Sequence, residues 1–239
     1  MKQLCSTLSL IALVAAATPA AHAEIQVPID DFKTGPYQSP PFKAGNNNTA
    51  FQTGAMMGGR RDEGLLICDT TVAGQCATAN PFNQSAAFAI RASATNPKRY
   101  LLIHSAGYDL GPRLEVDYGF GAPMSQNFSN LVDQGGTGRI RLNFDGLSET
   151  LNFNVLLYSS NGHYAQSGCN MPQHNGPFGV ELAFNKFIHD SMFTFVDVSH
   201  IVLIFQSSST IGTVNFGIGS VEASDTQHGD ALQCFIPMS

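Results

Sequence analysis

The sequence contains no tryptophan and little charge. Asp, Glu, Lys and Arg together make up 13% of the 239 residues, whereas 43% of the residues are hydrophobic. Chains that stay unfolded have the opposite balance, so this chain is expected to bury a sizeable core. Because Trp is absent, any surface that binds a ligand by ring stacking has to be built from Tyr and Phe.

Basic residues are also scarce. The sequence has 12 Lys and Arg residues against 18 Asp and Glu residues, its formal net charge is −6, and no basic cluster occurs. Binding to the phosphates of DNA or RNA depends on gathered Lys and Arg side chains. The composition therefore argues against nucleic acid as a partner.

There is a single long hydrophobic run, near the N-terminus. Lys2 is followed by an apolar stretch from Leu8 to Ala17, and small residues follow at Ala21 and Ala23. The stretch has about half of the roughly 20 residues needed to span a bilayer, and its flanks match a secretory signal peptide. We therefore predict a signal peptide over residues 1–23 and an exported mature chain, extracellular or periplasmic, without a membrane span.

Familiar catalytic motifs are missing as well. The sequence has no Gly-x-Ser-x-Gly elbow, no His-Glu-x-x-His motif and no phosphate-binding Gly-Lys-Ser/Thr loop. The histidines after the signal peptide are scattered at spacings that match no metal motif. These absences favour a non-catalytic protein, although they leave the question of enzymatic activity open.

Four cysteines follow the signal peptide, at positions 68, 76, 169 and 234. An oxidising compartment favours disulfides, and four cysteines allow three pairings. Cys68 and Cys76 enclose a short turn-rich loop, whereas Cys169 lies in an expected loop and Cys234 in the tail. We therefore predict the pairs Cys68–Cys76 and Cys169–Cys234. The alternative, one zinc site made by all four thiolates, lacks the usual short ligand spacing.

Alternation of apolar and polar residues is abundant along the chain. In segment 113–118, Leu114, Val116 and Tyr118 alternate with polar residues, and this period of two is typical of strands with one buried face. Strands are expected at 86–92, 100–104, 113–118, 139–144, 151–155, 179–184, 201–206 and 213–221. About eight or more such strands predict an all-β fold, an antiparallel jelly-roll β-sandwich formed by residues 24–239 as a single domain.

Three segments allow more than one interpretation. Ile201–Phe205 is apolar throughout, which predicts a strand buried on both sides. In Glu181–His189 some apolar residues also fall at helical spacing, but a strand followed by a loop is preferred. The Gly- and Asn-rich stretch Gly45–Thr49 is expected to be a loop.

Several short motifs resemble one type of domain. The segment Ile29–Phe32 resembles the opening strand of galactose-binding-like jelly rolls, the fold shared by many carbohydrate-binding modules. Met57–Asp62 is similar to a Gly-Gly-x-Arg-Asp turn that follows that opening in some secreted bacterial proteins. The stretches Phe193–Phe205 and Thr213–Val221 resemble the closing strand pair. Together these pieces span nearly the whole mature chain in the right order.

The resemblance implies binding of a glycan or another cell-surface ligand at a sheet face or at loops. The rings that can replace Trp as stacking surfaces in Gly-rich contexts are Tyr108, Phe120 and Tyr164, and further aromatic candidates are Tyr37, Tyr118 and Tyr158. The alternative role of each ring is packing in the core or a loop. Members of the family often hold a structural calcium between the first and last strands, where the nearest acids here are Asp30, Asp31 and Glu222.

Two expected strands carry charged faces. Glu115 and Asp117 share one face of segment 113–118, and another strand presents Arg139, Arg141 and Asn143 in the same manner. If these strands were neighbours, their side chains would form one patch able to bind sugar hydroxyls. Glu115 and Asp117 would alternatively supply paired carboxylates for acid and base catalysis on a glycosidic bond. The plain alternative is a solvated face with weak cross-strand ion pairs.

The motif Gly58-Gly-Arg-Arg-Asp62 is chemically distinctive. Two glycines permit a turn with positive φ, after which Arg60 or Arg61 can pair with a carboxylate such as Asp62, Asp30 or Asp31. We interpret the motif as a latch between the opening strand and its neighbour, with a ligand-facing arginine as the alternative.

These features favour a secreted, non-catalytic binding protein that recognises a carbohydrate or a cell-surface ligand. One alternative is a structural or surface-interaction protein of the envelope or matrix. The other is a carbohydrate-active enzyme, a glycoside hydrolase or lyase, that uses Glu115 and Asp117.

Overall fold

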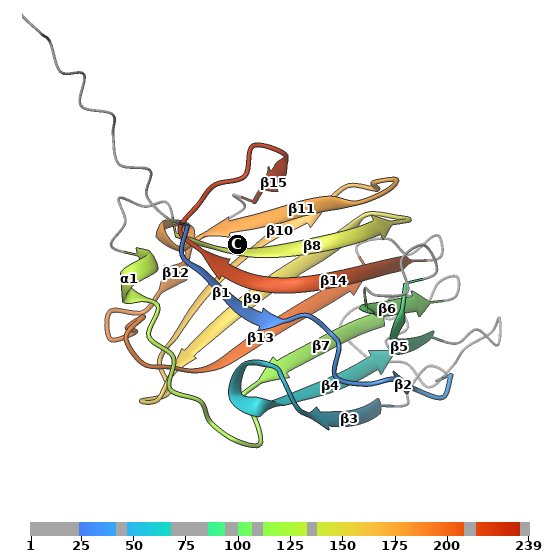
Figure 1. Ribbon diagram of the computed structural model, residues 1–239, viewed down its shortest axis with the longest axis horizontal. Coiled ribbons are helices and arrows are strands. Elements are labelled where there is room, and N and C mark those ends of the chain that lie inside the picture. The colour runs from blue at the N-terminus through green and yellow to red at the C-terminus, as the bar shows by residue number, and fades with distance from the viewer. Residues whose placement is uncertain are drawn as a thin grey trace, which may run out of the picture.

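The computed structural model describes residues 24–41, 47–67, 86–93, 100–106, 112–132, 138–207 and 214–234. These residues form two β-sheets that pack face to face (Figure 1). The predicted signal peptide, the predicted Cys68–Cys76 bridge and Tyr108 lie outside the described residues.

The first sheet, called sheet A below, has the strand order β15-β11-β8-β14-β6-β5-β2, and β1 also pairs with β14. Its strands are β1 (Gln26–Asp30), β2 (Tyr37–Gln38), β5 (Ala86–Ala92), β6 (Tyr100–Ala106), β8 (Arg139–Leu147), β11 (Phe178–Ala183), β14 (Asn215–Ser224) and β15 (Ala231–Gln233).

The second sheet, sheet B, has the order β12-β10-β9-β13-β7-β4-β3. Its strands are β3 (Asn47–Thr53), β4 (Arg60–Ile67), β7 (Pro112–Tyr118), β9 (Leu151–Ser159), β10 (Tyr164–Met171), β12 (Ile188–His189) and β13 (Val198–Ser207). Among the described residues, helical structure is limited to the short turns η1 (Met57–Gly59), α1 (Ser129–Val132) and η2 (Phe184–Lys186). No helix in the described part of the chain is long and apolar enough to cross a membrane.

The core lies between the sheets and follows the alternation seen in the sequence. Along β7 and β9 every second residue is buried, which confirms the predicted strands 113–118 and 151–155. Phe205 of sheet B stacks on Phe153 beside it at 4.9 Å and meets Phe144 of sheet A edge-on at 6.4 Å between ring centroids. Ring contacts of this kind tie the two sheets into one hydrophobic core.

The fold class predicted from the sequence is confirmed: the protein is an all-β jelly-roll sandwich. Between β6 and β9 the chain changes sheet at every step, from β6 in A to β7 in B, then to β8 in A and β9 in B. The strand pairs are antiparallel, with one exception in the described residues, because β15 runs parallel to β11.

Some local predictions were wrong. Gly45–Thr49 was expected to be a loop, but in its described part Asn47 begins β3, which pairs with β4 through Thr53. Ile201–Phe205 was expected to be buried on both sides, but only Ile201, Leu203 and Phe205 are buried and the residues between them are half-buried. The preferred interpretation of Glu181–His189 holds in outline, since β11 ends at Ala183 and a single 3₁₀ turn follows.

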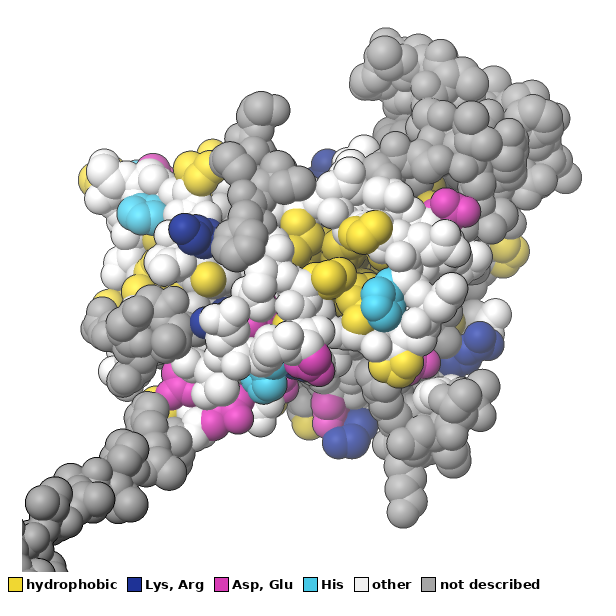
Figure 2. Space-filling model, turned by 90° about the horizontal axis from the view of Figure 1, so that it is seen from above, with side chains coloured by type: hydrophobic (Ala, Val, Ile, Leu, Met, Phe, Trp, Pro, Cys, Tyr) yellow, Lys and Arg dark blue, Asp and Glu magenta, His cyan; other side chains and the backbone are white. Residues whose placement is uncertain are grey.

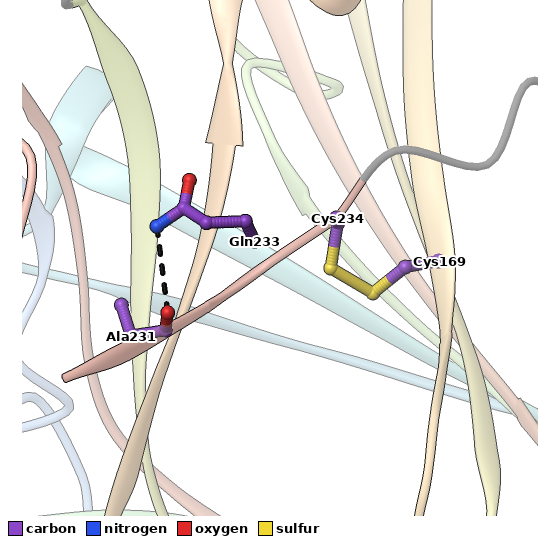
Figure 3. The surroundings of a disulfide bond; sticks show 4 residues. All are labelled: Cys169, Ala231, Gln233 and Cys234. Carbon is purple, nitrogen blue, oxygen red and sulfur yellow. Dashed lines mark hydrogen bonds between the residues drawn. A yellow bond between two sulfur atoms is a disulfide. The ribbon is translucent and has the colours of Figure 1, made fainter. Parts of the chain in front are cut away.

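The C-terminal segment is fixed to both sheets. The predicted disulfide between Cys169 and Cys234 is present, with 5.1 Å between the Cα atoms (Figure 3). Cys169 was expected in a loop, but it lies on β10 of sheet B, whereas Cys234 directly follows β15 of sheet A. The Cys234 amide also donates to the Glu181 carbonyl at 3.1 Å. The bridge therefore closes one edge of the sandwich.

The other end of the chain is held by a buried ion network. Gly58 and Gly59 adopt φ values of 73° and 70° in the turn before β4, as the two glycines of the motif suggested. Arg61 then points into the interior, where its side chain is fully buried and binds Asp30 at 2.5 Å. The Tyr118 hydroxyl donates to the same Asp30 oxygen at 3.0 Å. Arg61 thus forms the latch between the opening strand and β4.

The network also raises the pKa of Glu63. Arg61 binds Glu63 at 2.7 Å, so two buried carboxylates, those of Asp30 and Glu63, share one guanidinium group. The pKa of Glu63 rises to about 7, mainly because the carboxyl is buried. Repulsion from Asp30 and Asp62 adds to this rise, and the attraction of Arg61 is too weak to cancel it. The cluster therefore contains a carboxyl group that titrates near neutral pH.

Candidate functional site

The outer face of sheet B is hollowed into a groove. Two adjoining open hollows, of about 330 Å³ and about 450 Å³, lie on this face. The first lies over β3, β4 and β7, and the second over β7, β9 and β13. Both are lined by Glu115, Asp117 and Phe120, so the two hollows meet at β7. We refer to this continuous feature as the sheet B groove.

Strand register arranges the groove residues in a row across the sheet. Asp62 lies opposite Asp117 on β7 and opposite Phe51 on β3. On its other side, Asp117 faces Val202 of β13, which in turn faces Leu156 of β9. Directly opposed residues of antiparallel strands point to the same face, so these five side chains line the groove from one end toward the other.

The floor of the groove is apolar. Val202 and Ile204 are the half-buried residues of the apolar segment on β13, and both line the larger hollow with Leu156. The unbroken apolar run 201–205 supplies core residues on one face and these floor residues on the other. An apolar floor on the outer face of a sheet marks a binding surface more often than an ordinary solvated face.

Exposed aromatic rings flank this floor. Phe51 is 59% exposed and Phe120 is 71% exposed, and both line the smaller hollow. At the far end Tyr158 and Tyr164 pair across β9 and β10 with 5.8 Å between ring centroids. Rings of this kind offer flat apolar faces to a ligand.

The position of Phe120 depends on the glycine before it. Gly119 has a φ of 108°, and a Cβ atom on it would lie only 2.3 Å from the carbonyl oxygen of Ser199. Only glycine fits this close approach, which turns the chain sharply at the end of β7. The turn brings the ring of Phe120 to the rim shared by the two hollows.

Two of the three carboxylates in the groove are paired with arginine. Arg60 binds Asp62 through two hydrogen bonds, of 2.8 Å and 2.5 Å, and its guanidinium lies 4.2 Å from the ring centre of Phe51. Arg113 forms an ion pair with Glu115. Asp117 lies between these two pairs and forms no ion pair with any residue that the structure describes.

The environment of Asp117 favours its protonated form. Burial raises the pKa of Asp117 to about 7, and the neighbouring negative charges of Asp62 and Glu115 add to the rise. A hydrogen bond with the Phe120 backbone acts in the opposite direction but is outweighed. One oxygen, Oδ1, is buried and has no hydrogen-bond partner among the described residues. The groove therefore holds a carboxyl group that titrates near neutral pH.

The site residues predicted from the sequence fall in several places. The groove is lined by Arg60, Glu115 and Asp117. Tyr164 lies beside it, in contact with Tyr158. Arg61 lies in the interior instead of facing a ligand, because it is fully buried against Asp30 and Glu63. Among the other aromatic candidates, Phe120 and Tyr158 line the groove, whereas Tyr118 is buried in the core and Tyr37 packs on Phe88.

The two charged faces do not form one patch. Glu115 and Asp117 lie on β7 of sheet B, whereas Arg139, Arg141 and Asn143 lie on β8 of sheet A. The two strands are therefore not neighbours and no combined patch forms, because the chain crosses from one sheet to the other after β7. Consecutive strands in a jelly roll commonly belong to different sheets.

The residues on sheet A form a separate polar cluster under the C-terminal segment. Arg139 and Arg141 each donate to the buried carboxylate of Glu181 at 3.0 Å. Burial acts to raise the pKa of Glu181, but hydrogen bonds from Gln233, His228 and Arg139 outweigh it and hold the pKa below its ordinary value. Since these bonds come largely from the segment before and within β15, the cluster fixes that segment to the sheet.

An open hollow of about 400 Å³ adjoins this cluster. Its polar lining includes Arg141, Asn143 and Ser220, which are joined by hydrogen bonds of 2.9 Å from Arg141 to Asn143 and from Asn143 to Ser220. These side chains already satisfy one another, in contrast to Asp117 in the sheet B groove. Figure 2 shows the molecule from above, where one group of hydrophobic side chains lies near the centre beside a histidine, acidic side chains gather separately below it, and the Lys and Arg side chains are scattered.

The three acids suggested as calcium ligands point to different places. Asp30 is buried against Arg61, Asp31 is exposed beside Lys33 at 2.5 Å, and Glu222 lies 3.8 Å from Arg141. The structure does not bring their carboxylates together. Across the described ranges, no group of three or more His, Cys, Asp or Glu residues is placed to hold a metal ion.

Several groove residues were not predicted as ligand contacts from the sequence. Phe51 follows a polar Asn-rich stretch that was interpreted as a loop, and Val202 and Ile204 were assigned to a buried strand. Asp62 was considered only as a partner for an arginine. The alternation of Asp62 with Arg61 and Glu63 was visible in the sequence and, with a strand assigned there, would have placed Asp62 on the outer face.

Comparisons with known proteins give structural likeness only. No family model matches the chain, and no curated protein matches it. The structure is similar to a family 11 carbohydrate-binding module of a Clostridium thermocellum cellulosomal cellulase, with 11% identity, a TM-score of 0.39, and coverage of 87% of this chain and 99% of the module. It is also similar to a family 30 carbohydrate-binding module, with 10% identity, a TM-score of 0.40, and coverage of 87% and 91%.

A longer structure is matched over part of its length. An exo-β-agarase shows 9% identity and a TM-score of 0.42, and the match covers 61% of this chain and 23% of the agarase. The chain thus spans less than a quarter of that enzyme.

Proposed function

We propose that the protein is an exported carbohydrate-binding protein that holds a glycan chain in the sheet B groove. The observation that carries the proposal is the continuity of the groove across β4, β7, β13 and β9, with exposed rings at both ends. Export is proposed from the sequence of residues 1–23, which matches a signal peptide.

The groove supplies the two kinds of contact that a sugar needs. One face of a pyranose ring is apolar, and the apolar floor with the rings of Phe51, Phe120 and Tyr164 offers surfaces on which such a face can stack. Sugar hydroxyls require charged or polar partners, and the carboxylates, Arg60 and the hydroxyl groups of Ser160 and Tyr158 line the same groove. The groove is open and elongated, which suits a chain rather than a single small molecule.

One observation favours a second candidate, hydrolysis or lysis of the bound glycan. Asp117 has a pKa of about 7 and lies opposite Asp62, whose carboxylate accepts two hydrogen bonds from Arg60. A protonated carboxyl beside an ionised one is the arrangement used by many glycosidases. The arginine pairs of Asp62 and Glu115 oppose this role, because they occupy the carboxylates that would act as nucleophile or base.

The first experiment is a binding screen with the purified oxidised protein. Insoluble and soluble polysaccharides are tested by pull-down and calorimetry, with calcium and with a chelator. We expect saturable binding to at least one glycan, weakened when Phe120 is replaced by alanine. Release of reducing ends or unsaturated sugars during the same incubations measures catalysis directly.

Each outcome separates the candidate functions. Saturable binding without new sugar ends supports the binding protein, whereas new ends that disappear in Asp117→Asn support the enzyme. If no glycan binds while circular dichroism shows a folded sheet protein, the proposal fails and a structural or surface-interaction role takes its place. Loss of binding in chelator would show that glycan binding needs a metal ion.

A further inference from the structure

One row of opposed side chains crosses the whole of sheet B. Inside the groove the row contains one residue from each of five strands: Phe51, Asp62, Asp117, Val202 and Leu156. The row continues beyond the hollows, because Leu156 lies opposite Gln166 of β10 and Gln166 lies opposite Ile188 of β12. Two more strands of the sheet, β10 and β12, therefore lie in line with the groove.

Exposed apolar side chains follow this row. Among the described residues six large hydrophobic side chains are exposed, and four of these lie on the row or next to it: Phe51, Phe120, Tyr164 and Ile188. Tyr164 lies two residues before Gln166 on the same face of β10 and is 42% exposed, and Ile188 at the end of the row is 48% exposed. Single exposed hydrophobic residues are ordinary, but an aligned set on one face indicates a binding surface.

A wall closes the groove where the strands end. The larger hollow is lined there by Ser159, Ser160 and Gly162 from the turn between β9 and β10. Asp197 ties this turn to the segment that follows β7, because the hydroxyl groups of Ser160 and Ser125 both donate to its carboxylate, that of Ser125 at 2.9 Å. The wall prevents a bound chain from leaving along the strands at this end, so the chain has to run across the strands, along the row.

We propose that Tyr164, Gln166 and Ile188 form an outer subsite that continues the sheet B groove, so that the bound glycan crosses all seven strands of sheet B. This inference rests on the proposed function and defines the length of glycan that the site takes. Seven strands are separated by six spacings of about 4.8 Å, which makes the row about 29 Å long. Since one unit of an extended pyranose chain is about as long as one spacing, the complete row holds about six units.

The outer subsite offers the contacts that a sugar unit needs. The ring of Tyr164 packs against Tyr158 with 5.8 Å between ring centroids, so its apolar surface is already held in place. Ile188 adds an apolar contact, and the amide of Gln166 can both donate to sugar hydroxyls and accept from them. A polar group thus lies among apolar surfaces, which is the combination found in many ligand sites.

The test measures how affinity depends on the length of the sugar chain. The probes are oligosaccharides of two to eight units from β-1,4-glucan, β-1,4-mannan, β-1,3-glucan and agarose, together with those released by partial hydrolysis of any other polysaccharide retained in the screen. Calorimetry compares the wild type, the double variant Tyr164→Ala, Ile188→Ala, and the control Val196→Ala. Val196 is 53% exposed and lies outside the row and both hollows.

We expect the affinity of the wild type for a series that binds to rise up to about six units and then to stay constant. The double variant is expected to bind six units about tenfold more weakly, while its affinity for three units changes by less than about twofold. Val196→Ala should match the wild type at every length.

Three results would overturn the inference and leave glycan binding intact: wild-type affinity that levels off at three or four units, affinity that still rises at eight units, or a double variant that keeps full affinity for six units. The wild-type series decides the question even if circular dichroism shows that the double variant does not fold. No binding of any probe or polysaccharide by the folded protein would overturn the proposed function itself.

Discussion

Arg61 on β4 binds Asp30 at the end of β1 through a fully buried ion pair with an N–O distance of 2.5 Å. The two residues are 31 positions apart and belong to different sheets, since β1 pairs with β14 and β4 with β7. A buried guanidinium and its carboxylates are costly to leave unpaired. The pair therefore holds the opening strand against β4 across the two sheets.

Replacing Asp30 by asparagine is expected to lower the free energy of unfolding by about 3–5 kcal/mol, because Arg61 then keeps only Glu63 as a charged partner and Tyr118 loses its acceptor. Urea unfolding followed by fluorescence or circular dichroism measures the change. The control is Asp31→Asn, whose partner Lys33 is 63% exposed, and its effect should stay below about 1 kcal/mol. Equal effects of the two variants would contradict the assignment of Asp30 to a buried network.

The raised pKa of Asp117 predicts a dependence of stability on pH. A carboxyl whose pKa rises from 3.8 to about 7 on folding binds its proton more tightly in the folded state. Its contribution to stability is therefore complete below about pH 4 and is lost as the pH rises toward 7. Asp117→Asn should lose less stability than the wild type between pH 4.5 and pH 8.

Urea unfolding at several pH values measures both slopes. Glu63, whose pKa is also raised to about 7, acts in the same direction, so Glu63→Gln should flatten the slope further in combination. Parallel curves for the wild type and Asp117→Asn would show that Asp117 is ionised throughout this range.

The exposed ring of Phe120 is expected to supply binding energy without supporting the fold. Since 71% of the residue is exposed, Phe120→Ala should leave the thermal midpoint within about 2 °C of the wild type and weaken glycan binding by roughly tenfold. The matched control is Val196→Ala, another exposed apolar residue outside both hollows. Calorimetry with the glycan identified in the screen compares them, and equal affinities would remove Phe120 from the site.

The disulfide between Cys169 and Cys234 is expected to stabilise the protein by about 2–4 kcal/mol, because it closes a chain segment with a separation of 65 residues. The double variant Cys169→Ala, Cys234→Ala removes it while leaving the other two cysteines in place. Hydrogen exchange should then rise first in β15 and β11, whose parallel pairing depends on the anchored tail. Exchange that rises evenly over both sheets would show that the bridge supports the whole sandwich instead.

Much of the fold was predictable from alternation within single segments. The strand β7 was predicted from the alternation of Leu114, Val116 and Tyr118 with polar residues. The predicted strand 86–92 has the same bounds as β5. The pattern fails where a strand is short or polar. β3 begins with asparagines, and β15 has three residues that are held by pairing with β11 and by the nearby bridge rather than by their own apolar face.

The site was less accessible to sequence reasoning than the fold. The shared face of Glu115 and Asp117 was predictable, because residues two apart on a strand point the same way. The groove, however, depends on the register that aligns Phe51, Asp117 and Val202 across sheet B, and no local pattern records that register. The same limitation explains why β7 and β8, which follow each other in sequence, were considered as neighbours although they lie in opposite sheets.

The short outer strands have a consequence for self-association. Sheet A ends on β15 and β2, and sheet B ends on β12 at one side, and these strands contain only two or three residues each. Unpaired strand edges invite another chain to add on, and very short edge strands remove that template. In the described sandwich the seven-residue β3 is an outermost strand that pairs only with β4, so the side of the molecule that carries Phe51 offers a longer template for strand addition than these short strands do.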